Sequence, residues 1–274
     1  MRCFVGIIRF TESTIISITK FKGNVKIFLM KIVVRECVKL EELSDCVQLQ
    51  RDVFGLPEIE ISPVRHLIVT KHAGGFTLGA FAGEKLVGFV LSVPAFIKGE
   101  KAFYSHMTAV DKNFQSYGIG TKLKWSQRER SLNEGIKFIK WTFQPVQARN
   151  AFFNLEKLGA VIKHYEPNFY GTDYSTSHQE NGKLGIDSDR LFAEWHLESE
   201  KVIALSNGEN FSEKDEVKHQ IEIPPNWNDL VKNNLQLAID TQFRIRTEFE
   251  KAFAEGLICK GFERDEISPK YLLY

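Results

Sequence analysis

A polar turn that contains two glycines is the stretch of this sequence best suited to chemistry. It reads Q-S-Y-G-I-G-T over residues 115–121, after an expected strand that ends at Val110 and before a helix expected to start at Gly118. The first N–H groups of a helix have no acceptor within the helix, and the helix dipole favours negative charge there. Gly118 and Gly120 lack a Cβ and let a ligand approach the backbone closely. The turn therefore predicts a site for a phosphate or pyrophosphate group.

Three known patterns of phosphate-binding turn can be compared with this segment. A Walker loop requires G-x-x-x-x-G-K-[ST], which the segment lacks. A dinucleotide-binding turn requires G-x-G-x-x-G directly after the strand, but Leu123 stands at the third glycine position and seven residues separate Val110 from Gly118. The third pattern is Q/R-x-x-G-x-G/A, and Gln115, Gly118 and Gly120 match each of its fixed positions.

With these residues the sequence resembles the GNAT superfamily of acyl-CoA N-acyltransferases. A second stretch agrees: residues 149–160 read R-N-A-F-F-N-L-E-K-L-G-A and are similar to the later helix of the family, which ends in a K-L-G-F/A turn. The resemblance covers about residues 31–171 and includes the order of strands and helices. The tail from about Leu191 lies outside the minimal family fold and resembles an extension found in one poorly characterised subgroup.

The resemblance implies acetyl-CoA, or another acyl-CoA, as co-substrate. It implies that the strands 103–110 and 136–143 run parallel and splay apart, so that the pantetheine arm pairs with exposed main chain like an added strand. Lys122 would add positive charge at the phosphates. The residues implied to bind the cofactor are Thr108 and Val110 through their main chain, Gln115, Ser116, Tyr117, Gly118, Ile119, Gly120 and Thr121 around the pyrophosphate, and Asn150 and Asn154 near the arm and the thiol.

The implied reaction is direct transfer of the acyl group to an amine. The amine must first lose a proton, because a free amine with a pKa near ~10 is mostly charged at neutral pH. His106, on the splayed strand, is the candidate base or substrate contact. Family members often protonate the departing thiolate with a tyrosine, but Leu155 holds that place here. Tyr165 and Tyr170, just downstream, are the candidate replacements.

Most of these residues also have a purely structural interpretation. His106 is equally well explained as a hydrogen-bonded histidine in the sheet, and packing explains Tyr165 and Tyr170 better than catalysis does. Asn150 also suits the N-terminal region of a helix. Asn154 lies in mid-helix, where asparagine is a poor helix former, and this position indicates a specific partner. The alternative function is a non-catalytic GNAT-fold protein that binds acyl-CoA or another protein.

Composition excludes several other classes of protein. The chain has 274 residues, a formal net charge of +1 and 43% hydrophobic residues. These values argue against intrinsic disorder and against a general nucleic-acid binder. Four scattered cysteines predict no disulfide framework, and the histidines show no metal-ligand spacing. No apolar run approaches the ~20 residues that span a bilayer. We expect a cytoplasmic protein without a metal or membrane partner, with a small-molecule or peptide amine as acceptor and a homodimer as one compatible assembly.

The elements that must position the turn follow from apolar periodicity. Strands are predicted at 32–37, 76–82, 86–93, 103–110, 136–143, 160–165 and 191–197, and helices at 40–54, 63–72, 118–134, 148–158 and 227–254. This order predicts a mixed α/β (α+β) sheet with helices on its faces. We expect an N-terminal extension over 1–29, which begins upstream of a second candidate start at Met30, the GNAT domain over 30–175, a polar linker over 176–190 and a C-terminal α/β extension over 191–274.

Overall fold

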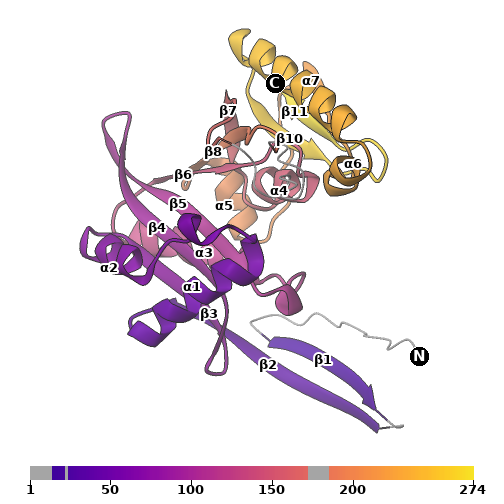
Figure 1. Cartoon of the computed structure of the whole chain (residues 1–274). Helices are drawn as coiled ribbons and strands as arrows, with labels where there is room; N and C mark the ends of the chain where they lie inside the picture. The colour runs from indigo at the N-terminus through magenta and orange to yellow at the C-terminus, as the bar shows by residue number, and fades with distance from the viewer. Residues whose placement is uncertain (1–13, 22–23, 172–184) are drawn as a thin grey trace. The chain divides into compact units, whose positions relative to one another are not determined.

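The computed structural model describes residues 14–21, 24–171 and 185–274 (Figure 1). The expectations for residues 1–13 and 22–23, and for 172–184 at the predicted linker, concern residues outside this description. The chain divides into two compact units, which are described separately. Unit 1 contains Met1–Pro94 and Ser105–Arg130, and unit 2 contains Ala95–Tyr104 and Ser131–Tyr274.

Unit 1 is built on antiparallel strands in the order β1-β2-β3-β4-β5. The strand β2 runs without a break through Met30, where the N-terminal extension was expected to end, and its second half pairs with β3. Strands β4 and β5 each contribute one part to unit 1 and one part to unit 2. The elements are β1 (Thr14–Phe21), β2 (Asn24–Glu36), β3 (Phe76–Ala82), β4 (Lys85–Ile97), β5 (Glu100–Val110), α1 (Leu40–Phe54), η1 (Glu58–Glu60), α2 (Val64–His72), η2 (Lys112–Phe114) and α3 (Ile119–Asn133).

Helix α1 has the bounds predicted from the sequence, and its two ends explain why. Glu42 accepts hydrogen bonds from the main-chain N–H groups of Val38 and Lys39 and pairs with Arg35 at 2.6 Å. The hydrogen bond with Arg35 is the largest effect that lowers the pKa of Glu42 to about 2. The helix ends at Gly55, whose φ of 64° is left-handed. One face of the helix is buried in a core of apolar side chains: Leu43, Cys46 and Leu49 pack there with Leu67, Phe89 and Leu91.

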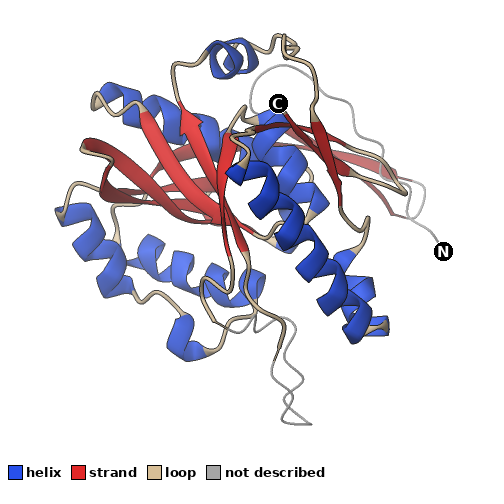
Figure 2. Ribbon diagram, turned by 90° about the horizontal axis from the view of Figure 1, so that it is seen from above, coloured by secondary structure: helices blue, strands red, loops and turns tan. Residues whose placement is uncertain are grey.

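Unit 2 continues with strands in the order β5-β6-β8-β7-β10-β11-β9. β5 and β6 run parallel, with ladder pairs at Phe103↔Ile139 and Tyr104↔Lys140, whereas the other pairs in this unit are antiparallel. Helix α7 packs on β7 and β9. The helices are blue and the strands red in Figure 2. The elements are β6 (Phe138–Phe143), α4 (Ala148–Phe152), η3 (Phe153–Lys157), β7 (Val161–Glu166), β8 (Arg190–His196), α5 (Glu200–Ser206), β9 (His219–Glu222), α6 (Trp227–Asn233), α7 (Leu235–Ala254), β10 (Cys259–Glu263) and β11 (Lys270–Leu273).

The position of β8 in the sheet was not expected for a segment that follows a linker and belongs to an appended extension. It lies between β6 and β7 and pairs with β6 from Phe138↔His196 to Phe143↔Leu191. Asp189, at the end of the expected linker, is buried. The segment therefore completes the sheet of unit 2. The sequence indicated a strand here, but its partners lie tens of residues away, and local patterning does not identify them.

Several further elements depart from the expectations. The helix predicted over 148–158 is the short α4 followed by the π-helical turn η3. The helix predicted over 227–254 is two helices, because the side chain of Asn234 accepts the N–H of Leu237 and caps a new start. Helix α5 and strand β11 were not anticipated. The mixed α/β class itself is confirmed.

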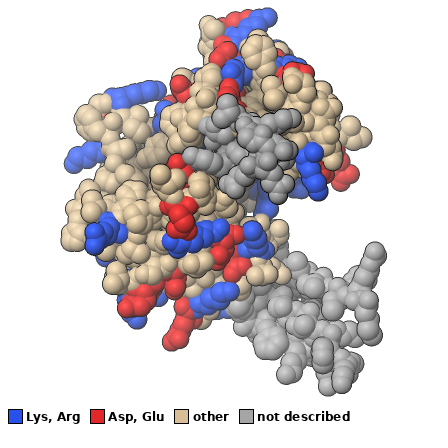
Figure 3. Space-filling view, in the orientation of Figure 1, with Lys and Arg blue, Asp and Glu red and all other residues tan. Residues whose placement is uncertain are grey.

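The distribution of charge on the surface and the apolarity of the helices can also be compared with the expectations from composition. Basic and acidic side chains are interspersed over the face shown in Figure 3. In the part of the chain that the structure describes, no helix is both long enough and apolar enough to cross a bilayer.

Candidate active site

The turn between β5 and α3 is fixed by side chains at its first half. The Asp111 carboxylate accepts the main-chain N–H of Asn113 at 2.9 Å and the Lys85 ammonium at 3.0 Å. The amide of Gln115 donates to the main-chain oxygen of Val110 at 3.1 Å. Gln115, a fixed position of the motif, therefore ties the turn back to the end of β5.

Two residues of the turn have left-handed backbones. Ser116 has a φ of 68° and Gly118 a φ of 76°. A residue with a Cβ is less stable there by roughly 1–2 kcal/mol, so Ser116 carries a strain that Gly118 avoids. A Cβ built on Gly118 would meet no atom within 4 Å, so this backbone faces open space. The turn thus presents its main chain outward immediately before the helix.

The N-terminus of α3 is the predicted anion site. The N–H of Lys122 makes the first helical bond, to the oxygen of Gly118 at 3.0 Å. The N–H groups from Gly118 through Thr121 precede that bond and have no acceptor within the helix. Four such donors at the positive end of a helix dipole suit a phosphate oxygen. The ammonium of Lys122, which was expected to add charge at the phosphates, donates to the main-chain oxygen of Ile32 at 2.5 Å.

The second half of β5 contains Thr108 and Val110. The N–H of Asp111 bonds to the oxygen of Val87 on β4 at 2.9 Å. Because the hydrogen-bonding direction alternates along a strand, the main-chain groups of Thr108 and Val110 point away from β4. This is the edge from which the resemblance expects an extended ligand to pair.

His106 lies on the same strand in a small polar cluster with two residues near α2. Its Nε2 is 3.5 Å from the hydroxyl of Ser62, and its ring centroid is 5.8 Å from that of His66. The residue as a whole is exposed. The pKa of His106 is lowered from its ordinary value, first because neighbouring atoms displace water from the ring and then because of His66. A neutral imidazole in contact with solvent is suited to accept a proton.

A buried lysine holds α3 against the strands. The Nζ of Lys124 donates to Ser105 on β5 at 3.0 Å and to Gln127 at 2.8 Å, and Gln127 donates to Ser92 on β4 at 2.7 Å. Lys124 is 2% exposed, and burial lowers its pKa well below the ordinary value. This network fixes the start of the helix relative to β5 and so positions the turn.

We expect the replacement Lys124→Met to flatten the pH dependence of stability. Between the lowered pKa of Lys124 and about 10.4, the unfolded chain binds a proton that the folded chain does not, so the free energy of unfolding rises with pH in this window. The variant should lose up to about 1.4 kcal/mol per pH unit of this slope in urea unfolding. The exposed Lys71→Met is the control, and an unchanged slope in Lys124→Met would show that Lys124 is charged in the fold.

In unit 2, a group of three hydroxyls lies beside the last ladder pair of β5 and β6. The hydroxyls of Thr142 and Tyr170 are 3.3 Å apart, and both residues lie close enough to Tyr104 to affect its pKa. Burial, followed by the proximity of Tyr170, raises the pKa of Tyr104 to about 12. Tyr170 is exposed, as a proton donor to a ligand requires. Sequence reasoning missed Tyr104, although its place two residues before His106 in one strand was an available signal.

Tyr165, the other tyrosine candidate, lies in the core of unit 2. Its hydroxyl donates to Asp189 at 2.5 Å, and its ring stacks on Phe249. Asp189 also accepts two hydrogen bonds from Arg246 on α7, at 2.8 and 3.0 Å. Burial and the neighbouring carboxylate raise the pKa of Tyr165, which therefore keeps its proton. The contacts indicate a role in holding α7.

The residues after β6 are divided between core and surface. Asn154, predicted to lie at the cofactor, is buried, and its side-chain oxygen accepts the indole N–H of Trp141 at 3.3 Å. Asn150 is exposed on α4. Leu155, at the place of the usual tyrosine, is fully buried. The position that supplies the general acid in the family is therefore a core position here.

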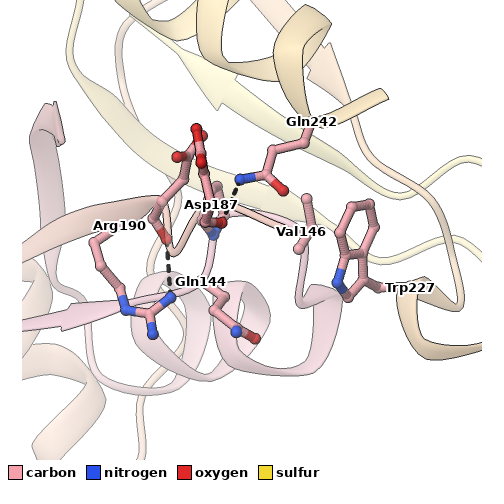
Figure 4. A pocket seen from close by; sticks show the side chains of 8 residues that line it. Gln144, Val146, Asp187, Arg190, Trp227 and Gln242 are labelled. Carbon is pink, nitrogen blue, oxygen red and sulfur yellow. Dashed lines mark hydrogen bonds between the residues drawn. The ribbon is translucent and has the colours of Figure 1, made fainter. Parts of the chain in front are cut away.

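A small recess lies at the end of β6, where the C-terminal helices meet the sheet (Figure 4). Its polar walls are already hydrogen-bonded: Gln242 donates to the oxygen of Asp187 at 2.7 Å, and Arg190 to the oxygen of Asp189 at 3.0 Å. Trp227 of α6 closes one side. Residues of α6 and α7 therefore line the same recess of unit 2 as the residues that follow β6.

Comparisons with known proteins agree with this geometry. Residues 43–160 match the model of the acetyltransferase (GNAT) family. A GNAT-family structure from Desulfovibrio desulfuricans has a TM-score of 0.50 at 13% identity, over 61% of this chain and 99% of that one, which shows the fold. Also similar are a GNAT acetyltransferase from Elizabethkingia anophelis with acetyl-CoA bound (TM-score 0.45, 17% identity, 61% and 98% covered) and an IAA acetyltransferase from Bacillus cereus (0.45, 18%, 61% and 100%). No curated protein has a sequence that matches this chain.

Proposed function

Because residues 43–160 match the model of the acetyltransferase (GNAT) family, we propose that this protein transfers an acyl group, acetyl in the simplest case, from acyl-CoA to an amine. The observation that carries the proposal is the N-terminus of α3. There, the N–H groups from Gly118 to Thr121 follow a turn with two left-handed residues and precede the first helical bond. Such a site accepts the pyrophosphate of CoA without any side-chain cation.

The remainder of the cofactor would follow β5. The main-chain groups of Thr108 and Val110, which point away from β4, would pair with the pantetheine arm. The oxygen of Val110 already accepts from Gln115, so its contribution would come from its N–H group. Asn150, exposed on α4, remains the proposed contact in unit 2, whereas the side chain of Asn154 is engaged by Trp141.

The transfer step would be a direct attack. The amine nitrogen bonds to the thioester carbonyl carbon, the C–S bond breaks, the proton of the amine passes to a base and the CoA thiolate takes a proton from an acid. His106, with its lowered pKa, is the proposed base. Tyr104 and Tyr170 are the proposed acids; the raised pKa of Tyr104, about 12, keeps its hydroxyl protonated at neutral pH.

Two measurements test the proposal together. Calorimetry with acetyl-CoA measures binding, and release of free CoA thiol in the presence of a panel of amines measures transfer. The second candidate function is a CoA-binding protein without activity, which is favoured by the buried Leu155 at the usual tyrosine position. Binding with thiol release supports the enzyme, binding without release on any amine supports the second candidate, and no binding overturns both.

His106→Ala should lower kcat about 100-fold and leave the Kd for acetyl-CoA nearly unchanged, because general-base catalysis contributes about 10²–10⁴-fold. His66→Gln provides a second readout. Removing His66 removes a cause of the lowered pKa of His106, so the pKa rises and the acid limb of the pH–rate profile moves to higher pH. A profile with the same acid limb in His106→Ala would remove this residue from the mechanism.

A further inference from the structure

Three lysines surround one buried carboxylate on the sheet of unit 2. The side chain of Glu194, on β8, is 5% exposed. Its Oε1 is 3.6 Å from the ammonium of Lys98 and 4.0 Å from that of Lys140, and its Oε2 is 3.9 Å from that of Lys163. His196 lies 3.8 Å from Oε2. We refer to Lys98, Lys140 and Lys163 as the lysine cluster.

The lysine cluster has more positive charge than Glu194 neutralises. His196, followed by the three lysines, lowers the pKa of Glu194 to about 2, so one negative charge is present at neutral pH. Three lysines and one carboxylate leave a net charge of +2. All three lysine–glutamate distances exceed the ~2.7–2.9 Å of a charge-assisted hydrogen bond. The ammonium groups therefore keep donors for another anion.

The lysine cluster begins where the proposed transfer chemistry lies. Lys140 is paired with Tyr104 in the last ladder position of β5 and β6. Thr142 is two residues further along β6, and alternation places it on the same face as Lys140. Its hydroxyl lies 3.3 Å from that of Tyr170. The same face of unit 2 thus carries the proposed proton donors and, next to them, the cationic cluster.

Lys140 is the most sheltered member of the lysine cluster, and it lies over the ring of Phe192. The ammonium of Lys140 is 4.5 Å from the centroid of the Phe192 ring. Its side chain is 18% exposed, compared with 74% for Lys98 and 44% for Lys163. A carboxylate placed between the three ammonium groups would meet one sheltered cation and two that are open to solvent. Charge interactions are stronger at the sheltered position, where water screens them less.

We propose that the amine acceptor carries a carboxylate group and that the lysine cluster binds it. This inference rests on the proposed function and adds the substrate class: an amino acid or a peptide with an acidic residue, as opposed to a neutral or polycationic amine. Both sources share the carboxylate chemistry, and the test distinguishes them.

The test compares acceptors that differ only in charge. Leucine and leucinamide, and two short C-terminally amidated peptides that contain either one glutamate or one glutamine, form pairs of nearly equal shape in which only one member carries a carboxylate. The acidic member should have a KM about tenfold lower, which corresponds to a few weak ion pairs acting together. Whichever acidic compound shows the larger preference, amino acid or peptide, identifies the source of the carboxylate. Equal KM values within both pairs would overturn the proposal.

Variants assign the preference to the lysine cluster. Lys140→Met and Lys163→Met should each raise the KM for the acidic acceptor several-fold and leave that for the amide unchanged. Lys137→Met is the matched control, because Lys137 already pairs with Glu198 at 2.7 Å and lies outside the cluster. An equal effect of Lys140→Met on both members of a pair would contradict the assignment.

A binding measurement separates this inference from the proposed function. If no amine releases thiol from acetyl-CoA, calorimetry of the acidic and amide compounds without acetyl-CoA still tests the cluster. Tighter binding of the acidic compound, lost in Lys140→Met, supports an anion-binding surface independently of transfer. Equal binding of the two compounds rejects the cluster, whatever the result for transfer.

Discussion

Gly118→Asp is expected to reduce the affinity for acetyl-CoA about 1000-fold, a difference of about 4 kcal/mol. Gly118 has a φ of 76°, a Cβ there would meet no atom within 4 Å, and its oxygen accepts the first bond of α3, from the N–H of Lys122. An aspartate there would place a carboxylate against the proposed pyrophosphate, and like charges in a binding site cost several kcal/mol. The left-handed backbone alone would cost a residue with a Cβ roughly 1–2 kcal/mol of stability. The cost is smaller for aspartate, which tolerates this conformation.

Two controls separate these effects in calorimetric titrations with acetyl-CoA. Gly118→Asn adds a similar side chain without the charge and should lose much less affinity. Gly135, after the other end of α3, has a φ of 73° and the same open surroundings. Gly135→Asp therefore imposes comparable backbone strain away from the site and should bind acetyl-CoA normally. If Gly118→Asp binds acetyl-CoA as tightly as Gly135→Asp does, the phosphates do not lie at this turn.

The parts of the fold that sequence predicted are those fixed by local interactions. Helix α1 was located by its apolar spacing and by the glycine that ends it, both of which act within a few residues. The turn at 115–121 was recognised because the motif residues have local tasks: Gln115 reaches back five residues to Val110, and Gly118 takes a left-handed φ. Local causes leave a readable pattern in a single sequence.

Other features depend on partners far along the chain, which local patterns do not reveal. The strand β8 was predicted, but its place between β6 and β7 is decided by pairing across about 50 residues. Asn154 was assigned to the cofactor, yet its partner is Trp141, and no spacing rule connects an indole to that helix position. Tyr165 was considered for catalysis because of its chemical type, whereas its environment is set by α7, some 80 residues later.

The same long-range contact predicts the largest loss of stability. Asp189→Ala should lower the free energy of unfolding of unit 2 by about 3–5 kcal/mol, because removing one partner of a buried ion pair leaves the other without compensation. Asp189 is 2% exposed and accepts from Tyr165 and, twice, from Arg246. Its loss would leave the Tyr165 hydroxyl buried without this acceptor and α7 without its main polar anchor.

Tryptophan fluorescence during urea unfolding measures this effect, since three of the four tryptophans, all except Trp125, lie in unit 2. Asp187→Ala is the matched control: its carboxylate pairs with the same Arg246 at 2.8 Å, but its side chain is 48% exposed, so the loss should be at most about 1 kcal/mol. Tyr165→Phe, which removes one hydrogen bond, should cost about 1 kcal/mol. If Asp189→Ala were no more destabilising than Asp187→Ala, burial of the carboxylate would not be what holds α7, and the ion pair would be only a surface contact.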